Sequence, residues 1–462
     1  MQPSLIRFPK SAALWLAAAL CPVLFSRAED SKPVSYYHDI VPVFKRSCTG
    51  CHHPGKLKGD LDLTTLAAIK KGGKHGIEFK EGEPAGSRMI EEISGEEPSM
   101  PKEGDPLSKE EIALITRWIK EGAADDTPAD KLNPFKLAAP PVYSAPSVIS
   151  SLVYSPDGNI LAVSGYHEVI LHKPDGSGVV ARLVGESPRI ESVAFSKDGK
   201  LLAVSGGAPS QFGEIQIWDV ETNALLHSYK ISPDSLYGVA FSPDAKRVSF
   251  GGADKSVRII AVDDGKELMK FDNHSDWVFG TTFTVDGKRL LTGSRDRAMK
   301  LINTENGQFI DDINKLLENV LCIARHPKED VVIYGGEQGT ARIYKIAENQ
   351  GRTAANNDVN MVREFERMPG PIHAVAYNPE GTQVALGGIG SEVRIYKTAD
   401  GTLAATLKGH EGAVFAIAYN PKKPEIATGG YEGKVRLFDS AKGDLVKSFV
   451  PFPIKETQVA GK

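Results

Sequence analysis

The sequence has few cysteines and little net charge, and it has only one long apolar run, near its start. Four cysteines in 462 residues exclude a fold held together by many disulfides. A net charge of −4 without a basic tract gives no electrostatic ground for binding nucleic acid, and we expect no such partner. Beyond residue 28 no apolar run is long enough for a membrane helix, so we expect no transmembrane segment in the mature chain.

The first 28 residues have the order of a secretory signal peptide. Arg7 and Lys10 precede an apolar run over residues 12–25, and a small-residue cleavage site follows at 26–28. We therefore expect residues 1–28 to be a signal peptide and the protein to be exported, to the periplasm or cell envelope. An uncleaved anchor is the alternative. The mature chain would keep three cysteines, Cys48, Cys51 and Cys322.

The length predicts two or three domains. Residues 29–126 have the apolar spacing of a small all-α domain. Asp39 can cap a first helix, which runs into the cysteine pair. Ser108 and Glu111 have capping-box spacing, before apolar residues at helical intervals. The buried stripe expected on the first helix is Ile40, Val43 and Phe44. Two further helices are expected over residues 64–71 and 87–93.

Residues 127–146 contain five prolines and no helical or strand period, as in a semi-rigid linker. From residue 147 to 452 one pattern occurs seven times. "SLVYSPDGNILAVSG" from Ser151, for example, returns as "AIAYNPKKPEIATGG" from Ala416. Each copy has an alternating apolar strand, a turn of the Pro-Asp-Gly kind and a second strand. A period near forty with four strand-like runs is typical of propeller blades.

These units resemble WD40 repeats, although Trp218-Asp219 is the one intact Trp-Asp dipeptide. The resemblance covers about two thirds of the chain and implies an all-β, seven-bladed propeller. Residues 453–462 are expected to form a C-terminal tail. The sequence does not decide which strand closes the ring. Residues 444–450 could complete the seventh blade, or a strand near Val142 could do so.

Residues 48–54 read CTGCHHP. A structural zinc site needs four nitrogen or sulfur ligands, and the third mature cysteine lies far away in the chain. A redox disulfide of this spacing expects a βαβ context, which is missing. C-x-x-C-H in an exported chain instead indicates attachment of one covalent haem c through Cys48 and Cys51. His52 directly follows the second cysteine, so it is the expected axial ligand rather than His53.

The second axial ligand must come from elsewhere. Met100 lies on a loop between Pro98 and Pro101, which hold the backbone extended, and is the expected ligand. Met89 falls in a helical pattern, where a methionine is usually core filling. His75 is the runner-up.

Residues 35–126 resemble the planctomycete-type cytochrome c domain. The matching stretches are "DIVPVFKRSCTGCHHPGKLKGDLDL", "KKGGKHG" and "PSMPKEGDPLSKEEIALITRWIKEGA". The resemblance implies thioether links at Cys48 and Cys51, axial ligands His52 and Met100, and packing of Trp118 near the haem. Fusion to a WD40 propeller looks like an arrangement seen in that same group of envelope proteins.

Other chemistry-bearing side chains have structural explanations. His274 and His410 stand where WD repeats place a histidine that forms hydrogen bonds inside the blade, and Asp296 is the expected partner of His274. Cys322 lies between apolar residues of a strand and is expected to be a buried, inert thiol. No catalytic residue set is predicted.

We therefore expect an exported electron carrier whose propeller is an interaction platform. Its partners would be an unidentified redox protein and other proteins bound through propeller loops. Whether the protein is an enzyme stays open. A redox enzyme with a second cofactor or substrate in the propeller is one alternative, and a scaffold stabilised by haem is another.

Overall fold

The structure is a computed structural model, and it describes residues 32–53, 56–128, 137, 139–315, 317–348 and 358–455. The predicted signal peptide, part of the predicted linker and most of the predicted tail lie outside these residues. Within the described part of the chain, no helix is long and apolar enough to cross a membrane.

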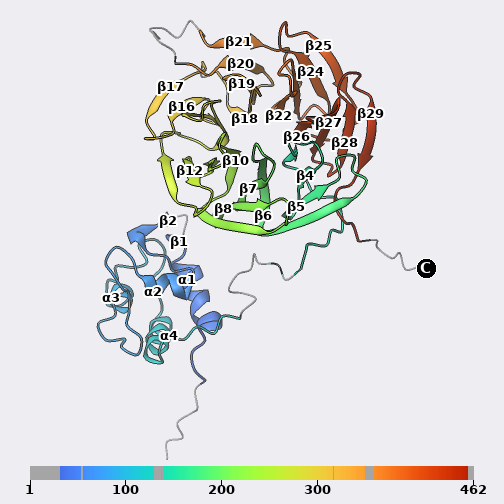
Figure 1. Ribbon diagram of the computed structural model, residues 1–462. Helices are drawn as coiled ribbons and strands as arrows, with labels where there is room; N and C mark the ends of the chain where they lie inside the picture. Colours follow the sequence, from blue (N-terminus) through green and yellow to red (C-terminus); the bar gives the residue numbers. More distant parts are fainter. Residues whose placement is uncertain are drawn as a thin grey trace, which may run out of the picture. The chain divides into compact units, whose positions relative to one another are not determined.

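The chain divides into two compact units. One contains the residues before Cys48 together with Ile77–Asp126. The other contains Cys48–Gly76 and everything from Thr127 onward. Figure 1 shows the labelled helices α1–α4 in the first part of the sequence and a ring of sheets in the later part. The borders predicted for the domains stay predictions.

The first unit is built from short helices. A π-helical segment, Tyr36–Ile40, leads into α1 (Val41–Ser47), and the predicted stripe of Ile40, Val43 and Phe44 is buried. The predicted cap was wrong. Ser35 caps this segment by accepting a hydrogen bond from the His38 N–H, while Asp39 accepts one from the Ser35 N–H at 2.9 Å. Ser35 takes the cap because the chain turns four residues earlier than the apolar pattern begins.

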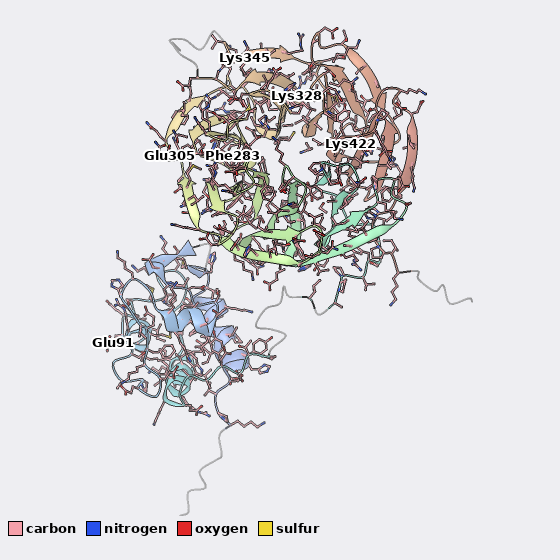
Figure 2. The ribbon with its side chains drawn as sticks, viewed as in Figure 1. Glu91, Phe283, Glu305, Lys328, Lys345 and Lys422 are labelled. Carbon is pink, nitrogen blue, oxygen red and sulfur yellow. The ribbon has the colours of Figure 1, made fainter. Side chains whose placement is uncertain are left out.

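Two further helices complete this unit. Ser87 precedes α3 (Arg88–Ile93), on which Figure 2 labels Glu91. Helix α4 (Lys109–Lys120) begins with the predicted capping box. The Ser108 N–H donates to Glu111 Oε2 at 2.9 Å, and the Glu111 N–H donates to Ser108 Oγ at 3.2 Å. The side chains that α4 buries are Ile115, Trp118 and Ile119.

The segment Cys48–Gly76 is only partly helical. Strand β1 (His52–His53) pairs antiparallel with β2 (Lys56–Leu57), and a 3₁₀ turn follows at Lys58–Asp60. Helix α2 (Leu66–Lys71) starts at the cap Thr65 and ends at Gly72, whose φ of 77° favours glycine. The prediction of an all-α region therefore holds only coarsely, because a short strand pair lies among the helices.

The strands of the propeller form one seven-stranded and five four-stranded sheets. The seven-stranded sheet contains β3 (Leu152–Tyr154), β4 (Leu161–Ser164), β5 (Tyr166–His172), β6 (Val179–Phe195), β7 (Leu201–Ala208), β8 (Phe212–Asp219) and β9 (Leu225–Ser232). The next two sheets contain β10 (Leu236–Phe241), β11 (Arg247–Gly252), β12 (Val257–Ala261) and β13 (Glu267–Phe271), then β14 (Val278–Phe283), β15 (Arg289–Ser294), β16 (Lys300–Asn303) and β17 (Phe309–Asp312). The last three contain β18 (Val320–Arg325), β19 (Val331–Gly336), β20 (Ala341–Lys345) and β21 (Met361–Glu364), then β22 (Ile372–Tyr377), β23 (Gln383–Gly388), β24 (Val393–Lys397) and β25 (Leu403–Leu407), and finally β26 (Val414–Tyr419), β27 (Glu425–Gly430), β28 (Val435–Asp439) and β29 (Leu445–Phe449).

The seven-stranded sheet consists of two blades that share one long strand. The first part of β6 pairs with β5, and its second part, from Arg189 to Phe195, pairs with β7. With the five four-stranded sheets this makes seven blades, as the seven repeats predict. The innermost strands of neighbouring blades pack against one another around the ring. Figure 2 shows side chains filling the space between the sheets.

The repeated turn motif has a physical cause that recurs from blade to blade. In the first copy, the Ser155 hydroxyl donates to Asp157 Oδ1 at 2.5 Å and accepts from the Ile160 N–H at 3.0 Å. Gly158 then adopts a φ of 73°, which an L side chain rarely takes. The same hydroxyl–carboxylate pair recurs at Ser196–Asp198, Ser242–Asp244 and Thr284–Asp286.

The ring closes without exchanging a strand between its first and last blades. Strand β29 is the outer strand of the last sheet, so residues 444–450 do complete the seventh blade. The two blades meet through buried apolar side chains, among them Ile149 and Leu152 on one side and Ala416 and Leu437 on the other. The chain segments that enter and leave the propeller also pair with each other, in a parallel bridge between Tyr143 and Ile454.

A buried ion pair fixes the entering segment. The Glu168 side chain is 0% exposed, and it accepts hydrogen bonds from Arg182 Nε and from the Tyr143 hydroxyl, both at 2.7 Å. Arg182 also donates to the Pro141 carbonyl at 2.7 Å. Arg182 thus balances the charge of Glu168, and Glu168 in turn fixes both Arg182 and Tyr143, the tyrosine that precedes the first blade.

We predict that Arg182→Met destabilises the propeller by roughly 3 kcal/mol, because it leaves the buried Glu168 carboxylate without a counter-charge. Chemical denaturation followed by circular dichroism measures the change. Lys270→Met is the matched control, since Lys270 and Asp272 form an exposed pair that contributes less than about 1 kcal/mol. Equal losses in the two variants would contradict this role for Glu168.

Candidate functional site

The C-x-x-C-H residues form one hydrogen-bonded turn after α1. The Cys48 carbonyl accepts hydrogen bonds from the N–H groups of Cys51 and His52, each at 3.1 Å. The two cysteines therefore lie one turn apart, although the regular helix already ends at Ser47. This geometry brings both cysteines and His52 into a single local structure.

The backbone on the far side of the turn is also held in place. The Cys51 carbonyl accepts from the Lys58 N–H at 3.1 Å, and the His52 carbonyl accepts from the Leu63 N–H at 3.0 Å. His52 lies in β1 opposite Leu57. The histidine backbone is thus positioned by residues from both ends of the following loop.

The residues of this turn fit a covalently attached haem. Neither Cys48 nor Cys51 forms a disulfide. The Nδ1 atom of His52 is buried and has no hydrogen-bond partner among the described residues, so no protein contact engages this ring nitrogen. The described part of the chain holds no group of three or more His, Cys, Asp or Glu side chains arranged for a metal ion.

Met100 and Trp118 lie in the other compact unit. Met100 is half-buried on a loop after α3, where its N–H donates to the Glu92 carbonyl at 2.9 Å. Met89, in contrast, is buried within α3, as expected for core filling. The runner-up, His75, is exposed in a turn. Axial ligation by Met100 stays a prediction.

Trp118 belongs to an aromatic cluster. It is 1% exposed, stacks on Tyr36 with the ring centroids 5.4 Å apart, and meets the edge of Phe79 at 5.3 Å. Its Nε1–H donates to the Ala124 carbonyl at 3.2 Å. These contacts make Trp118 a core residue, and its predicted place beside the haem stays a prediction.

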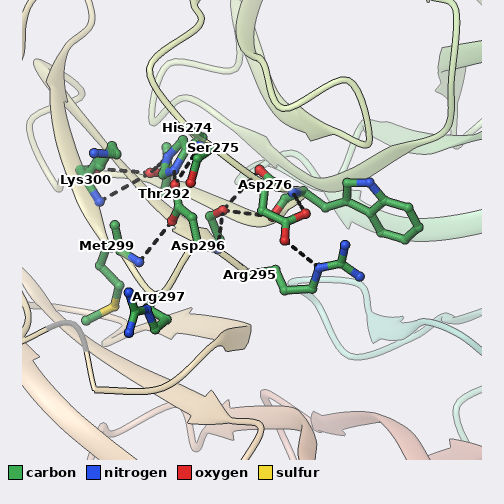
Figure 3. A network of polar contacts seen from close by, with 12 residues as sticks. His274, Ser275, Asp276, Thr292, Arg295, Asp296, Arg297, Met299 and Lys300 are labelled. Carbon is green, nitrogen blue, oxygen red and sulfur yellow. Dashed lines mark hydrogen bonds and ion pairs between the residues drawn. The ribbon is translucent and has the colours of Figure 1, made fainter.

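The predicted partnership of His274 is confirmed (Figure 3). Its Nδ1 lies 2.7 Å from Asp296 Oδ2, and its Nε2 lies 2.8 Å from the Thr292 hydroxyl. Burial by itself raises the pKa of Asp296. The hydrogen bond and charge of His274, with two backbone N–H donors, outweigh that effect and lower the pKa to about 2. The network therefore depends on an ionised carboxylate inside the blade.

His410 has the same structural role in the last blade. Its Nδ1 lies 3.2 Å from Glu432 Oε1, and its Nε2 lies 3.1 Å from the Thr428 hydroxyl. Burial, together with the charge of Arg436, lowers the pKa of His410. Glu432 thus has the position in this blade that Asp296 has in the blade of β14–β17.

Cys322 lies on the inner strand β18, and its thiol donates a hydrogen bond to the Ile372 carbonyl at 3.5 Å. It is half-buried rather than buried, because it lines a cavity of about 300 Å³ enclosed by the inner strands. Desolvation raises the pKa of its thiol to about 12, so the thiol is neutral, as the prediction of an inert cysteine requires. Seven further residues of this cavity, one from each blade, were missed, since no motif marks them. The signal was positional: they directly precede the first small residue of each repeat.

Comparison with known protein families supports both parts of this description. Residues 48–104 match the family described as Planctomycete cytochrome C, a span that includes Cys48, Cys51, His52 and Met100. Residues 223–260 match the WD domain, G-beta repeat, and residues 280–459 match the Nucleolar protein 10-like, N-terminal domain, a β-propeller family. The search of curated proteins finds no match. The predicted combination of a planctomycete-type cytochrome c domain and a WD40 propeller is confirmed.

We predict that Asp296→Asn destabilises the propeller at pH 7 by about 2 kcal/mol. The pKa of Asp296 is lowered in the fold, so its contribution is complete above the ordinary aspartate pKa near 4 and is lost as the pH falls toward 2. Denaturant titrations at pH 7 and pH 3 measure the difference. A loss that stays the same at both pH values would contradict the ionised network, and exposed Asp272→Asn is the control.

Proposed function

We propose that this protein is an exported c-type cytochrome that carries single electrons and binds partner proteins through its WD40 propeller. The observation that carries the proposal is the turn from Cys48 to His52, in which two thiols outside any disulfide directly precede a histidine with an unsatisfied ring nitrogen. The match of residues 48–104 to a cytochrome c family supports it.

Each residue of the site has a separate role in the proposal. Cys48 and Cys51 hold one haem through thioether bonds, and His52 and Met100 are the axial ligands. When bound, the haem supplies an iron centre that accepts and releases one electron. The hydrogen bonds at the carbonyls of Cys48 and His52 hold the backbone of the histidine in place.

Met100 contributes a soft, neutral thioether, which favours the reduced iron and raises the reduction potential compared with two nitrogen ligands. The bond from its N–H to Glu92 ties the ligand loop to the end of α3. Trp118 supplies a rigid apolar surface for the haem site in this proposal. The shielding of the iron from water would follow from such packing.

Export and partner binding complete the proposal. The predicted signal peptide over residues 1–28 accords with haem attachment outside the cytoplasm. The propeller supplies a rigid ring of loops, and WD40 propellers generally bind proteins. The electron donor or acceptor would then be a protein that docks on the chain.

The first test is covalent attachment. Protein produced together with a c-type haem maturation system should keep its haem through acid-acetone extraction. Cys48→Ser and Cys51→Ser should each weaken retention, and the double variant should abolish it. Cys322→Ser is the control, because this thiol lies in the propeller. Complete extraction of haem from the wild type would overturn the proposal, and a second chromophore would favour a redox enzyme.

The second test concerns the axial ligands. Met100→Leu should remove the methionine-type charge-transfer band of the oxidised protein and lower its reduction potential, while haem stays attached. Met89→Leu is matched in chemistry and should retain the band. His52→Ala and His53→Ala form a second pair, of which only the former should change the spectrum. A Met100→Leu spectrum identical to wild type would exclude Met100 as the ligand.

A further inference from the structure

The inner strands of the propeller enclose a cavity of about 300 Å³. Three successive positions of each inner strand supply most of its lining. The first of these positions contributes one residue from each blade, which we call the channel ring. The channel ring consists of Ser150, Glu191, Tyr237, Phe279, Leu321, His373 and Phe415.

A repeated β-bulge produces the channel ring. In β14, Val278 pairs with Ser294 and Gly280 pairs with Gly293, so Phe279 has no partner in the ladder. The same shift leaves out the ring residue in four other blades, namely Glu191, Leu321, His373 and Phe415. A bulge changes the direction of the side chain that it leaves unpaired. In these five blades the bulge thus directs one side chain toward the cavity.

Most of the channel ring is aromatic. Tyr237 and Phe279 meet edge to face with centroids 5.4 Å apart, and His373 and Phe415 do so at 5.5 Å. Trp277 stacks on Tyr237 at 6.1 Å and extends the aromatic surface beyond the ring. Aromatic faces carry partial negative charge, so this wall attracts cations more than anions.

Glu191 is the acidic residue of the channel ring. Its side chain is 12% exposed, and burial raises the pKa of its carboxyl group while the charge of Arg189 opposes that shift. Burial lowers the pKa of His373 and raises that of Tyr237 to about 12, so both are neutral at pH 7. Glu191 is therefore the residue of the channel ring that faces a cationic partner, Arg189.

The counter-ion of Glu191 is loosely held. Arg189 brings a terminal nitrogen to 3.1 Å from Glu191 Oε1, but the arginine side chain is 60% exposed. The geometry makes no hydrogen bond, since Oε1 is buried without a hydrogen-bond partner among the described residues. A better-placed cation could replace Arg189 at little cost, because the arginine can return to water.

We propose that the channel ring binds one cationic side chain, a lysine ammonium or an arginine guanidinium exposed on a partner protein. The carboxylate of Glu191 pairs with the charge, and the aromatic walls cover the methylene stem. The Glu191 carboxylate would repel an anion, and a neutral apolar group would leave that carboxylate without a partner. This inference rests on the proposed role of the propeller in binding proteins.

The size of the cavity favours a single side chain over a cofactor. About 300 Å³, with the ring side chains in place, is at the lower end of the range for small-molecule sites. The neighbourhood already holds one such contact: the Arg295 guanidinium lies 4.6 Å from the Trp277 ring centre and pairs with Asp276 at 2.9 Å. Beside the channel, a cation therefore rests on an aromatic face.

The test uses the haem-loaded protein and short Gly/Ser peptides with one central lysine, arginine or norleucine. Calorimetry should detect binding of the two cationic peptides and at least tenfold weaker binding of the norleucine peptide. Glu191→Gln should weaken the cationic peptides at least tenfold, and Phe279→Leu severalfold. The matched control Glu392→Gln changes a charge in another ion pair and should have no effect.

Arg189→Gln gives a prediction of opposite sign. Removal of the internal counter-ion should strengthen binding of the lysine peptide severalfold, whereas Lys270→Gln, which changes the net charge equally, should not. Peptide affinity that stays unchanged in the Glu191 and Arg189 variants would overturn the inference. Butylammonium that binds as tightly as the peptide would also overturn it, since the occupant would then be a free amine. Haem spectra of all variants test the electron-carrier proposal separately.

Discussion

The propeller depends on closure of its ring. Each sheet has two apolar faces, and only the neighbouring blades can cover both, so a gap between the first and last blades would expose one face of each. Here no strand crosses that junction. Buried apolar side chains close it, and the segments before and after the propeller reinforce it through Tyr143, Phe452 and the ion pair of Glu168 with Arg182.

Closure also determines what lies along the axis. Seven inner strands meet around one cavity, and a bulge at the same position of five of them turns one side chain each toward it. The bulges also shape the blades themselves, because a bulge increases the twist of its strand. They also place side chains on the axis, where residues can be polar or charged without disturbing the apolar cores between the blades. Glu191 and His373 are such residues.

The sequence predicted what depends on local spacing. The seven repeats, the capping box of α4 and the pair His274–Asp296 follow from patterns within one repeat or one helix turn. The cap of the first helix was assigned wrongly because Ser35 and Asp39 are both suitable caps within one turn. The pair Glu168–Arg182 could not be predicted, since it depends on which residues the strand register brings together. The channel ring had a signal only in its fixed position before each repeat, which does not show that these side chains meet. The ligand role of Met100 rests on its place in a loop between two prolines and on the resemblance, and it stays a prediction.

The chain thus combines a turn suited to one covalent haem with a rigid platform suited to proteins, and single-electron transfer is the claim on which the account depends. A spectroscopic redox titration of the haem-loaded wild type tests it most directly. The account predicts one reversible one-electron transition of a covalently held haem, at a potential typical of histidine–methionine ligation. A chain that takes up no haem, or haem that shows no reversible transition, would contradict it.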